Sequence, residues 1–304
     1  MTHHIASRRA RVPWITLLGL LLVMPAHANR GMIPFDPDVK LFEPNQRAMI
    51  AWNGPEEILV LSTDVHASKA TKVLEVLPVP DEPTVKKGDP EVFEKATRLI
   101  NSRVHRQMPL GGGPRGTAGG VKSAEPAGEV TFHEKIGAHD VSVTHVLSAE
   151  GFCEWAEDYL KRAGAENPRV SEPMQGVIRG YIKNGFTWFV YDVIELSEAV
   201  KTNSPLQYRF KSSCVYYPLK ITRTDNAETN IRLLILSPHM VTNFADLPID
   251  QITMPFPIID ITANELGMLN PDMAALLGNQ PGMKLRIWEL HKRTRHFSHD
   301  LMAY

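Results

Sequence analysis

Residues 47–61 have the sequence RAMIAWNGPEEILVL, which predicts two strands joined by a tight turn. Asn53-Gly54 suits the positive φ angles of a short hairpin turn. The run Ile58–Leu61 is continuously apolar, as in strands that are buried on both faces, whereas a strand with one solvated face alternates. A third strand is expected at Thr71–Leu77, just before Pro78. These residues predict a meander of strands that is covered on both faces.

Three amphipathic helices are predicted after the meander. The first begins at Asp89-Pro90, because an aspartate side chain accepts hydrogen bonds from free N–H groups and proline fits the first helical position. Ser148 and Ser171 can cap two further helices, which end near Gly164 and Asn184-Gly185. Apolar residues recur at helical spacing in all three, so each helix should pack one face on a sheet.

The segment from Glu129 to Leu147 predicts a second hairpin whose register can be specified. With Gly137-Ala138 as its turn, the pairs are Ile136 with His139, Lys135 with Asp140, Glu134 with Val141, His133 with Ser142 and Phe132 with Val143. In this register one face of the hairpin is mostly apolar and also carries His139 and His145. That face is expected to be buried.

Further strands are predicted at residues 186–194, 206–210, 214–222, 231–237 and 283–290, with a short helix at residues 270–278. The strands form groups with helices inserted between them, which predicts an α+β fold with mostly antiparallel strands in two groups.

Composition divides the chain into four regions. They are a leader at residues 1–28, a strand meander plus helix at 29–109, a Gly-rich linker or loop at 110–128, and an α+β region at 129–304 that can form one domain with 29–109. The Gly-rich region contains a G-x-G-x-x-G pattern. Because it follows a helix and includes a proline, it is not expected to bind a nucleotide.

The leader has the features of a secretory signal peptide. Arg8, Arg9 and Arg11 precede the apolar run Trp14–Met24, and Ala26-His27-Ala28 is a small-x-small cleavage site. The apolar run is about half of the roughly 20 residues that a spanning helix needs. We therefore expect an exported protein, periplasmic or secreted, that is soluble and has no stable membrane anchor.

The net charge limits the possible partners, and the number of cysteines limits the possible redox chemistry. Removing the leader takes away three of the 33 Lys and Arg residues and none of the 34 Asp and Glu residues, which leaves a net charge of about −4. A nucleic-acid partner is therefore not expected, and other partners stay open. Cys153 and Cys214 are the only cysteines. They can form a disulfide in an oxidising compartment or remain buried thiols, and in either state we expect them to pack close together.

The candidate binding residues are few. Asp64 and His66 are two residues apart at the end of a strand, so their side chains should point the same way, as metal ligands can. His139 and Asp140 begin the second strand of the hairpin, where a histidine on an apolar face is more typical of a hydrogen-bonded core. No cofactor is expected, and a divalent metal is the alternative.

The C-terminal tail carries His291, His296 and His299 among basic residues. Like charges disfavour a metal site there, so a solvated or frayed terminus is expected. A basic patch for acidic partners is the alternative.

Several segments together resemble the domain of unknown function 2330 family, whose prokaryotic members are typically exported. The matching segments are residues 29–34, 43–44, 51–54, 62–65, 73–78, 139–141 and 216–221. The resemblance covers about residues 30–223. It implies export and the order of elements, and it transfers no catalytic residue.

The combined features favour a binding or envelope-associated module of unknown activity. The alternative is an extracytoplasmic, metal-assisted enzyme of hydrolase type built from Asp64, His66 and the hairpin histidines. An enzyme should bring three nitrogen or oxygen ligands together, whereas a binding module should present an apolar or aromatic surface.

Export predicts cleavage after Ala28, because small residues at positions 26 and 28 follow a short apolar run. Intact mass spectrometry of the exported native protein should find a chain that begins at Asn29. A mature species that still contains Trp14–Met24 would contradict this prediction.

Overall fold

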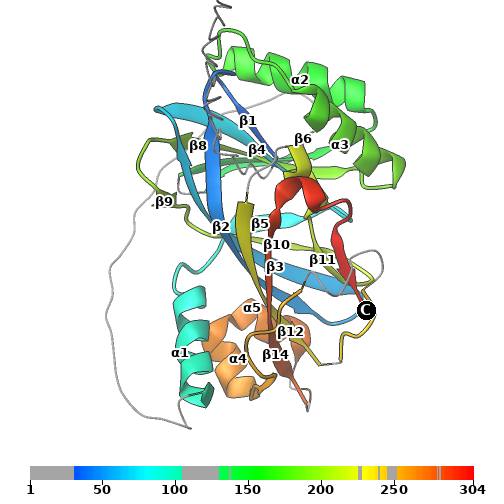
Figure 1. The fold of residues 1–304 in the computed structure, drawn as a ribbon. Helices are drawn as coiled ribbons and strands as arrows, with labels where there is room; N and C mark the ends of the chain where they lie inside the picture. Colours follow the sequence, from blue (N-terminus) through cyan, green and yellow to red (C-terminus); the bar gives the residue numbers. More distant parts are fainter. Residues whose placement is uncertain are drawn as a thin grey trace, which may run out of the picture.

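The computed structural model describes residues 31–104, 130–136, 138–224, 228–238, 240–244, 252–278, 280 and 282–304, which form five α-helices and fifteen strands. The leader, the Gly-rich region 110–128 and Gly137 lie outside the described residues. Helices and strands form four layers, with helices outside and two sheets inside (Figure 1). The predicted α+β class is confirmed.

Sheet A is entirely antiparallel. Its strands, in order, are β1 (Met32–Pro34), β4 (Thr71–Val79), β8 (Trp188–Leu196), β7 (His139–His145) and β6 (Val130–Ile136). Helices α2 (Ala149–Arg162) and α3 (Glu172–Lys183) cover its outer face. Ser148 and Ser171 cap these helices as predicted, since their side chains accept from the N–H groups of Gly151 and Met174.

Sheet B is larger and has one parallel pair, β2 with β12. Its strands, in order, are β13 (Ile259–Asp260), β14 (Lys284–Arg293), β12 (Glu228–Ser237), β2 (Leu41–Trp52), β3 (Glu56–Ala67), β10 (Leu206–Lys211) and β5 (Thr84–Lys87), with β9 (Lys201–Thr202) also on β3. Its outer face packs on α1 (Val92–Val104), α4 (Ala263–Leu269) and α5 (Pro271–Leu277). Both sheets take strands from regions 29–109 and 129–304.

The hairpin of β2 and β3 confirms the prediction from residues 47–61. Gly54 has a φ of 112° in the turn. Ile58 and Val60 face the helices, whereas Leu59 and Leu61 face sheet A, and all four are buried. Burying a Val, Leu or Ile side chain stabilises a fold by about 1.5–3 kcal/mol, so a strand buried on both faces contributes along its whole length.

The meander prediction is wrong at its third strand. β4 does not pair with β3 but lies in sheet A, between β1 and β8. Leu74 and Val76 of β4 face the helices, and Leu77 and Val79 face sheet B. A strand that is apolar on both faces fits either sheet equally well, so its pattern could not choose the partner.

The predicted register of the second hairpin is confirmed for all five pairs, from Ile136–His139 to Phe132–Val143. A shift in register follows between Phe132 and Val130. Val141 and Val143 are fully buried between the two sheets, as the expected apolar face requires.

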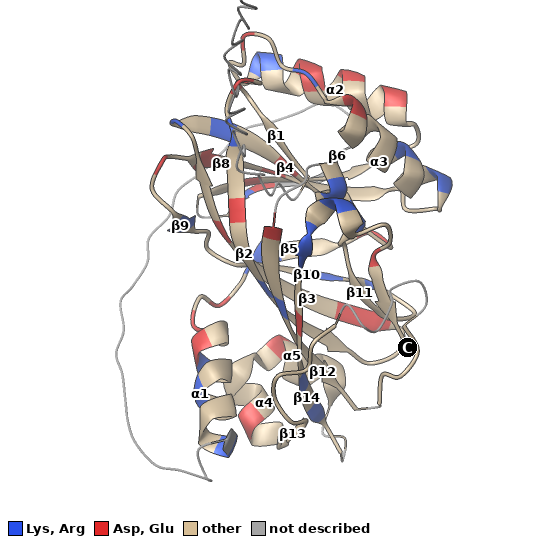
Figure 2. Cartoon of the chain, viewed as in Figure 1, with Lys and Arg blue, Asp and Glu red and all other residues tan. Residues whose placement is uncertain are grey.

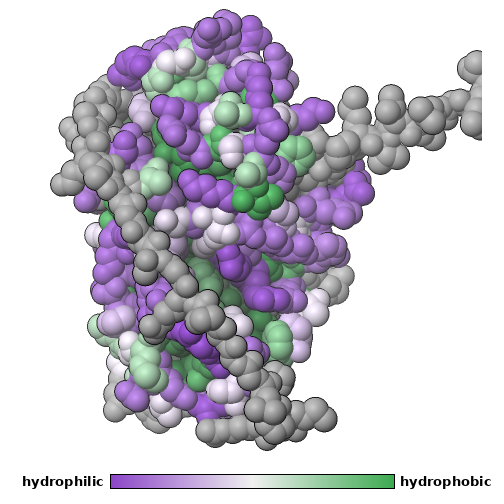
Figure 3. Space-filling view, turned by 90° about the vertical axis from the view of Figure 1, so that its left-hand side faces the viewer, coloured by the Kyte–Doolittle hydropathy of each residue, from purple (hydrophilic) through white to green (hydrophobic). Residues whose placement is uncertain are grey.

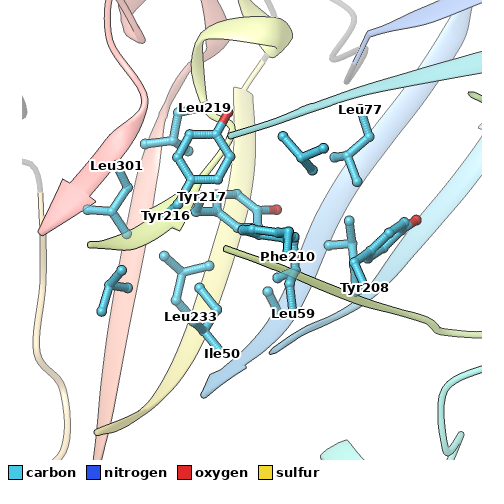
Figure 4. Packing of buried hydrophobic residues seen from close by; sticks show 14 of the residues in the cluster. Ile50, Leu59, Leu77, Tyr208, Phe210, Tyr216, Tyr217, Leu219, Leu233 and Leu301 are labelled. Carbon is cyan, nitrogen blue, oxygen red and sulfur yellow. The ribbon is translucent and has the colours of Figure 1, made fainter. Parts of the chain in front are cut away.

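The core between the sheets is closed by a third, two-stranded sheet of β11 (Val215–Tyr217) and β15 (Leu301–Ala303). Tyr216, Tyr217, Leu219 and Leu301 pack against strand residues of sheet B (Figure 4). The predicted strand 214–222 is therefore too long, because β11 ends at Tyr217 and a 3₁₀-helix, η2 (Lys220–Thr224), follows.

The tail is solvated but not frayed: His291, His296 and His299 are exposed, as expected, yet the chain around them is ordered. β14 continues to Arg293, and Leu301 and Ala303 are fully buried in β15. Asp300 fixes this end of the chain, since its Oδ1 accepts hydrogen bonds from the Tyr181 hydroxyl at 2.6 Å and from the Lys220 N–H at 2.7 Å. The many basic residues of the tail indicated a solvent-exposed segment, although Asp300, Leu301 and Ala303 are enough to anchor it.

The cysteines are both free thiols. Cys153 packs in the layer of α2 and α3, on the outer face of sheet A, whereas Cys214 is buried between the sheets. Sheet A lies between the two clusters, so the expected packing of one cysteine on the other does not occur. Burial raises the pKa of Cys153 to about 11, with the charge of Glu157 contributing.

None of the helices in the described part of the chain combines the length and the apolar character needed to cross a membrane.

Candidate functional site

The outer face of sheet B changes from apolar to polar along four neighbouring strands, β3, β2, β12 and β14. Residues that are register partners across these strands form rows. The apolar rows are Ile58, Ala51, Leu236, Leu285 and Val60, Met49, Leu234, Ile287. The polar rows are Ser62, Arg47, Arg232, Glu289 and Asp64, Asn45, Asn230, His291.

The helices cover only the apolar rows. The cluster formed with α1, α4 and α5 includes both apolar rows and no residue of the polar rows. Asn45, Asn230, Arg232 and His291 are exposed. Figure 3 shows the side of the molecule that carries α1, where a mostly hydrophilic surface includes some hydrophobic residues.

A cleft of about 510 Å³ lies at the boundary between the two kinds of row. Helix α1, the sheet and the segment Thr202–Pro205 form its walls. The apolar lining residues are Phe93, Ile100, Leu234, Phe256 and Ile287. The polar lining residues include Arg47, Arg232, Ser62, Thr97, Asn101 and Glu94, whose carboxylate pairs with Arg98. The cleft therefore has one apolar side and one side rich in hydrogen-bond donors.

Arg47 and Arg232 lie side by side at the centre of the polar rows, because they are register partners on parallel strands. Like charges that are directly opposite on a sheet repel one another. A carboxylate flanks each of them: Arg47 Nη2 lies 3.3 Å from Asp64 Oδ1, and Arg232 Nε donates to Glu289 Oε1 at 2.6 Å. These ion pairs hold the guanidinium groups in place and offset part of the repulsion.

The arginine pair retains exposed surface for a ligand. The side chains of Arg47 and Arg232 are 37% and 53% exposed, although each is paired with a carboxylate. The guanidinium of Arg47 also lies 5.6 Å from the centre of the Phe93 ring, which joins the polar side of the cleft to α1. A planar anion such as a carboxylate matches the fork of donors that arginine presents.

Asp64 lies in the polar rows beside Arg47, whereas the His66 side chain packs elsewhere. Asp64 accepts hydrogen bonds from Asn45 Nδ2 at 3.1 Å and from the Thr202 hydroxyl at 2.7 Å. The ring of His66 stacks on Phe42, with 4.5 Å between ring centres. The described residues contain no group of three or more His, Cys, Asp or Glu side chains that could hold a metal ion.

His139 and Asp140 lie at the far side of segment 202–205. Nδ1 of His139 forms a buried ion pair with Asp192, and Nε2 lies 2.8 Å from the carbonyl oxygen of Ser204. The Asp140 N–H donates to the same Asp192 carboxylate at 3.1 Å. The predicted residues therefore do not form one site, but the segment that carries Thr202 and Ser204 contacts both Asp64 and His139.

The buried pair holds its protons more strongly than either group does in water. Burial alone would lower the pKa of His139, but the hydrogen bond and the charge of Asp192 outweigh it and raise that pKa above 6.5. Burial raises the pKa of Asp192, although His139 acts in the opposite direction. Both groups therefore stabilise the fold most at low pH.

Replacing His139 by glutamine should change how stability depends on pH. Because the pKa of His139 is higher in the folded state than in the unfolded state, His139 stabilises the fold fully at pH values below its unfolded-state pKa. This stabilisation is lost as the pH rises through its folded-state pKa. At pH 6 we expect His139→Gln to lower the free energy of unfolding by about 3 kcal/mol, because it leaves Asp192 without its charged partner. The difference in the free energy of unfolding between wild type and His139→Gln should become smaller as the pH rises from 6 to 9.

Urea denaturation across that pH range measures the effect. His145→Gln is the control, since His145 contacts the Thr187 hydroxyl and the Trp188 ring, and it should keep the wild-type slope. A constant difference between wild type and His139→Gln at every pH would refute the assignment.

Comparison with solved structures gives only distant likenesses. The crystal structure of baculovirus P35 matches with a TM-score of 0.37 and 9% identity over 73% of this chain and 75% of that chain. The structure of a mutated baculovirus P35 after caspase cleavage matches with a TM-score of 0.35 and 8% identity over 71% and 75%. At this level of similarity neither match supports an argument about the present chain. No curated protein matches it.

A family model does match. It describes an uncharacterized protein conserved in bacteria, and it covers residues 24–264, which include β2, β3 and β12 with both arginines of the cleft. The match extends over most of the chain. It includes all the segments, from residues 29–34 to residues 216–221, in which the sequence resembles this family. The chain belongs to the bacterial family known as domain of unknown function 2330.

Proposed function

We propose that the protein is an exported binding module, and that the cleft beneath α1 takes a small amphipathic ligand with a carboxylate end. The observation that carries the proposal is the position of the Arg47–Arg232 pair at the edge of the apolar rows. The basic, apolar and small-residue pattern of residues 1–28 supports export.

The apolar side of the cleft suits the body of such a ligand. Phe93 and Ile100 of α1 line it together with the sheet residues Leu234 and Ile287, and Phe256 adds a further apolar contact. A volume of about 510 Å³ falls in the range of clefts that bind small molecules, roughly 300–1,000 Å³. Each methylene group that the cleft removes from water should add about 0.8 kcal/mol.

The polar side suits the charged end. Asp64 and Glu289 fix the two guanidinium groups before any ligand binds, so little side-chain entropy is lost on binding. A carboxylate between the arginines would relieve their mutual repulsion and accept from the exposed part of the guanidinium groups, since 37% of the Arg47 side chain is exposed. The lining groups thus supply fixed positive charge, hydrogen-bond donors and apolar contacts, which together suit an amphipathic ligand with a carboxylate end.

A fatty-acid series tests both sides of the cleft. Isothermal titration calorimetry should show decanoate binding more tightly than octanoate, and octanoate more tightly than hexanoate, by about tenfold for every two methylene groups. Arg47→Met and Arg232→Met should each weaken decanoate binding by about tenfold, because each removes charged hydrogen bonds.

The neutral analogue decanol provides the sharper control. Wild type should bind decanol about a hundredfold more weakly than decanoate, whereas Arg232→Met, which keeps Arg47, should prefer decanoate only about tenfold. Arg179→Met, on the exposed side of α3, should behave as wild type. Equal binding of decanoate by wild type and both cleft variants would rule out the arginine pair as the carboxylate site.

A further inference from the structure

A second hollow lies on the opposite helical layer, between α3 and η2. It has a volume of about 460 Å³ and is lined by Pro173, Gly176, Val177, Gly180, Lys183, Asn184, Lys220 and Arg223. The glycines leave the helix surface bare: a Cβ at Gly176 would meet nothing within 4 Å, and a Cβ at Gly180 would lie 3.6 Å from Lys220 Nζ. The hollow, which we call the α3 groove, therefore has room beside three cationic side chains.

Among the described residues none of the three cations forms a side-chain ion pair, although the charge of the buried Asp300 acts on Lys220. Lys183 and Arg223 are exposed, and Lys220 is half-buried. Arg179, also on α3, differs from them because it pairs with Glu150. Figure 2 shows the basic residues along α3.

Lys220 is held in position by the Asp300 carboxylate and by the Tyr181 ring. Its backbone N–H donates to Asp300, and its ammonium group lies 4.1 Å from the centre of the Tyr181 ring. The Tyr181 hydroxyl donates to the same Asp300 oxygen, so ring, backbone and carboxylate form one fixed unit. Partial burial lowers the pKa of Lys220, since the charged form is less well hydrated there.

The charge of Asp300 offsets only part of the cost of burying Lys220, and Arg223 beside it adds a like charge, so an anion in the groove would favour the charged form of Lys220. Two lysines provide point charges, and an arginine provides a planar fork that matches phosphate oxygens. We propose that the α3 groove binds a phosphate group through Lys183, Lys220 and Arg223. The phosphate can come from free phosphate or from the headgroup of a phospholipid, and both present the same oxygens.

Binding of inorganic phosphate to the exported protein, followed by isothermal titration calorimetry, tests the site. Binding of vesicles, of phosphatidylcholine with or without phosphatidic acid, identifies the source. The variants are Lys183→Gln and Arg223→Gln at exposed positions, and Lys220→Met, which keeps an apolar chain over Tyr181. Lys87→Gln is the matched control, because Lys87 is an exposed lysine of β5 in the other sheet.

We expect one saturable phosphate site, or binding to vesicles only when they contain phosphatidic acid. Each of the three groove variants should weaken that binding by about tenfold, and Lys87→Gln should not change it. Decanoate binding should be unchanged in Arg223→Gln, which separates this site from the cleft beneath α1. Wild-type protein that binds neither probe, or variants that bind as wild type does, would overturn the proposal.

Discussion

The boundary between the apolar and polar rows on sheet B determines where its helices can lie. Helices α1, α4 and α5 gain free energy by covering Met49, Leu234 and their row partners. Extending that cover over Arg47 and Arg232 would remove two neighbouring cations from water, at a cost of several kcal/mol for each ion. The helical layer therefore stops at the boundary, and the cleft is the space that remains beneath the edge of α1.

A buried carboxylate plays a comparable role in the other half of the molecule. Asp300 joins the C-terminal tail to α3 through Tyr181 and to η2 through the Lys220 N–H. Burial raises the pKa of Asp300, although these hydrogen bonds oppose the shift. Its contribution to stability is therefore largest at low pH and decreases as pH rises from the unfolded-state value through the folded-state value. The α3 groove depends on this network, because the network fixes Lys220.

Local patterns predicted much of the fold but little of the site. Caps, the hairpin register and two-sided burial each depend on residues close together in sequence, and all three were confirmed. The polar rows depend on pairing β2 with β12, parallel strands that are far apart along the chain. Arg47 and Arg232 each look like an ordinary solvent-facing residue until that pairing is known. The spacing of Asp64 and His66 predicted side chains on one face of a strand, but local spacing could not indicate that Asp64 contacts Arg47 while His66 stacks on Phe42.

Hydrogen–deuterium exchange with saturating decanoate tests the central claim, that a ligand occupies the edge of the helical layer, most directly. Exchange should slow in α1, in residues 202–205 and in β12 around Arg232, because these segments form the walls of the cleft. Slower exchange confined to α2 and α3, or no change in α1 and β12 at saturation, would contradict the account.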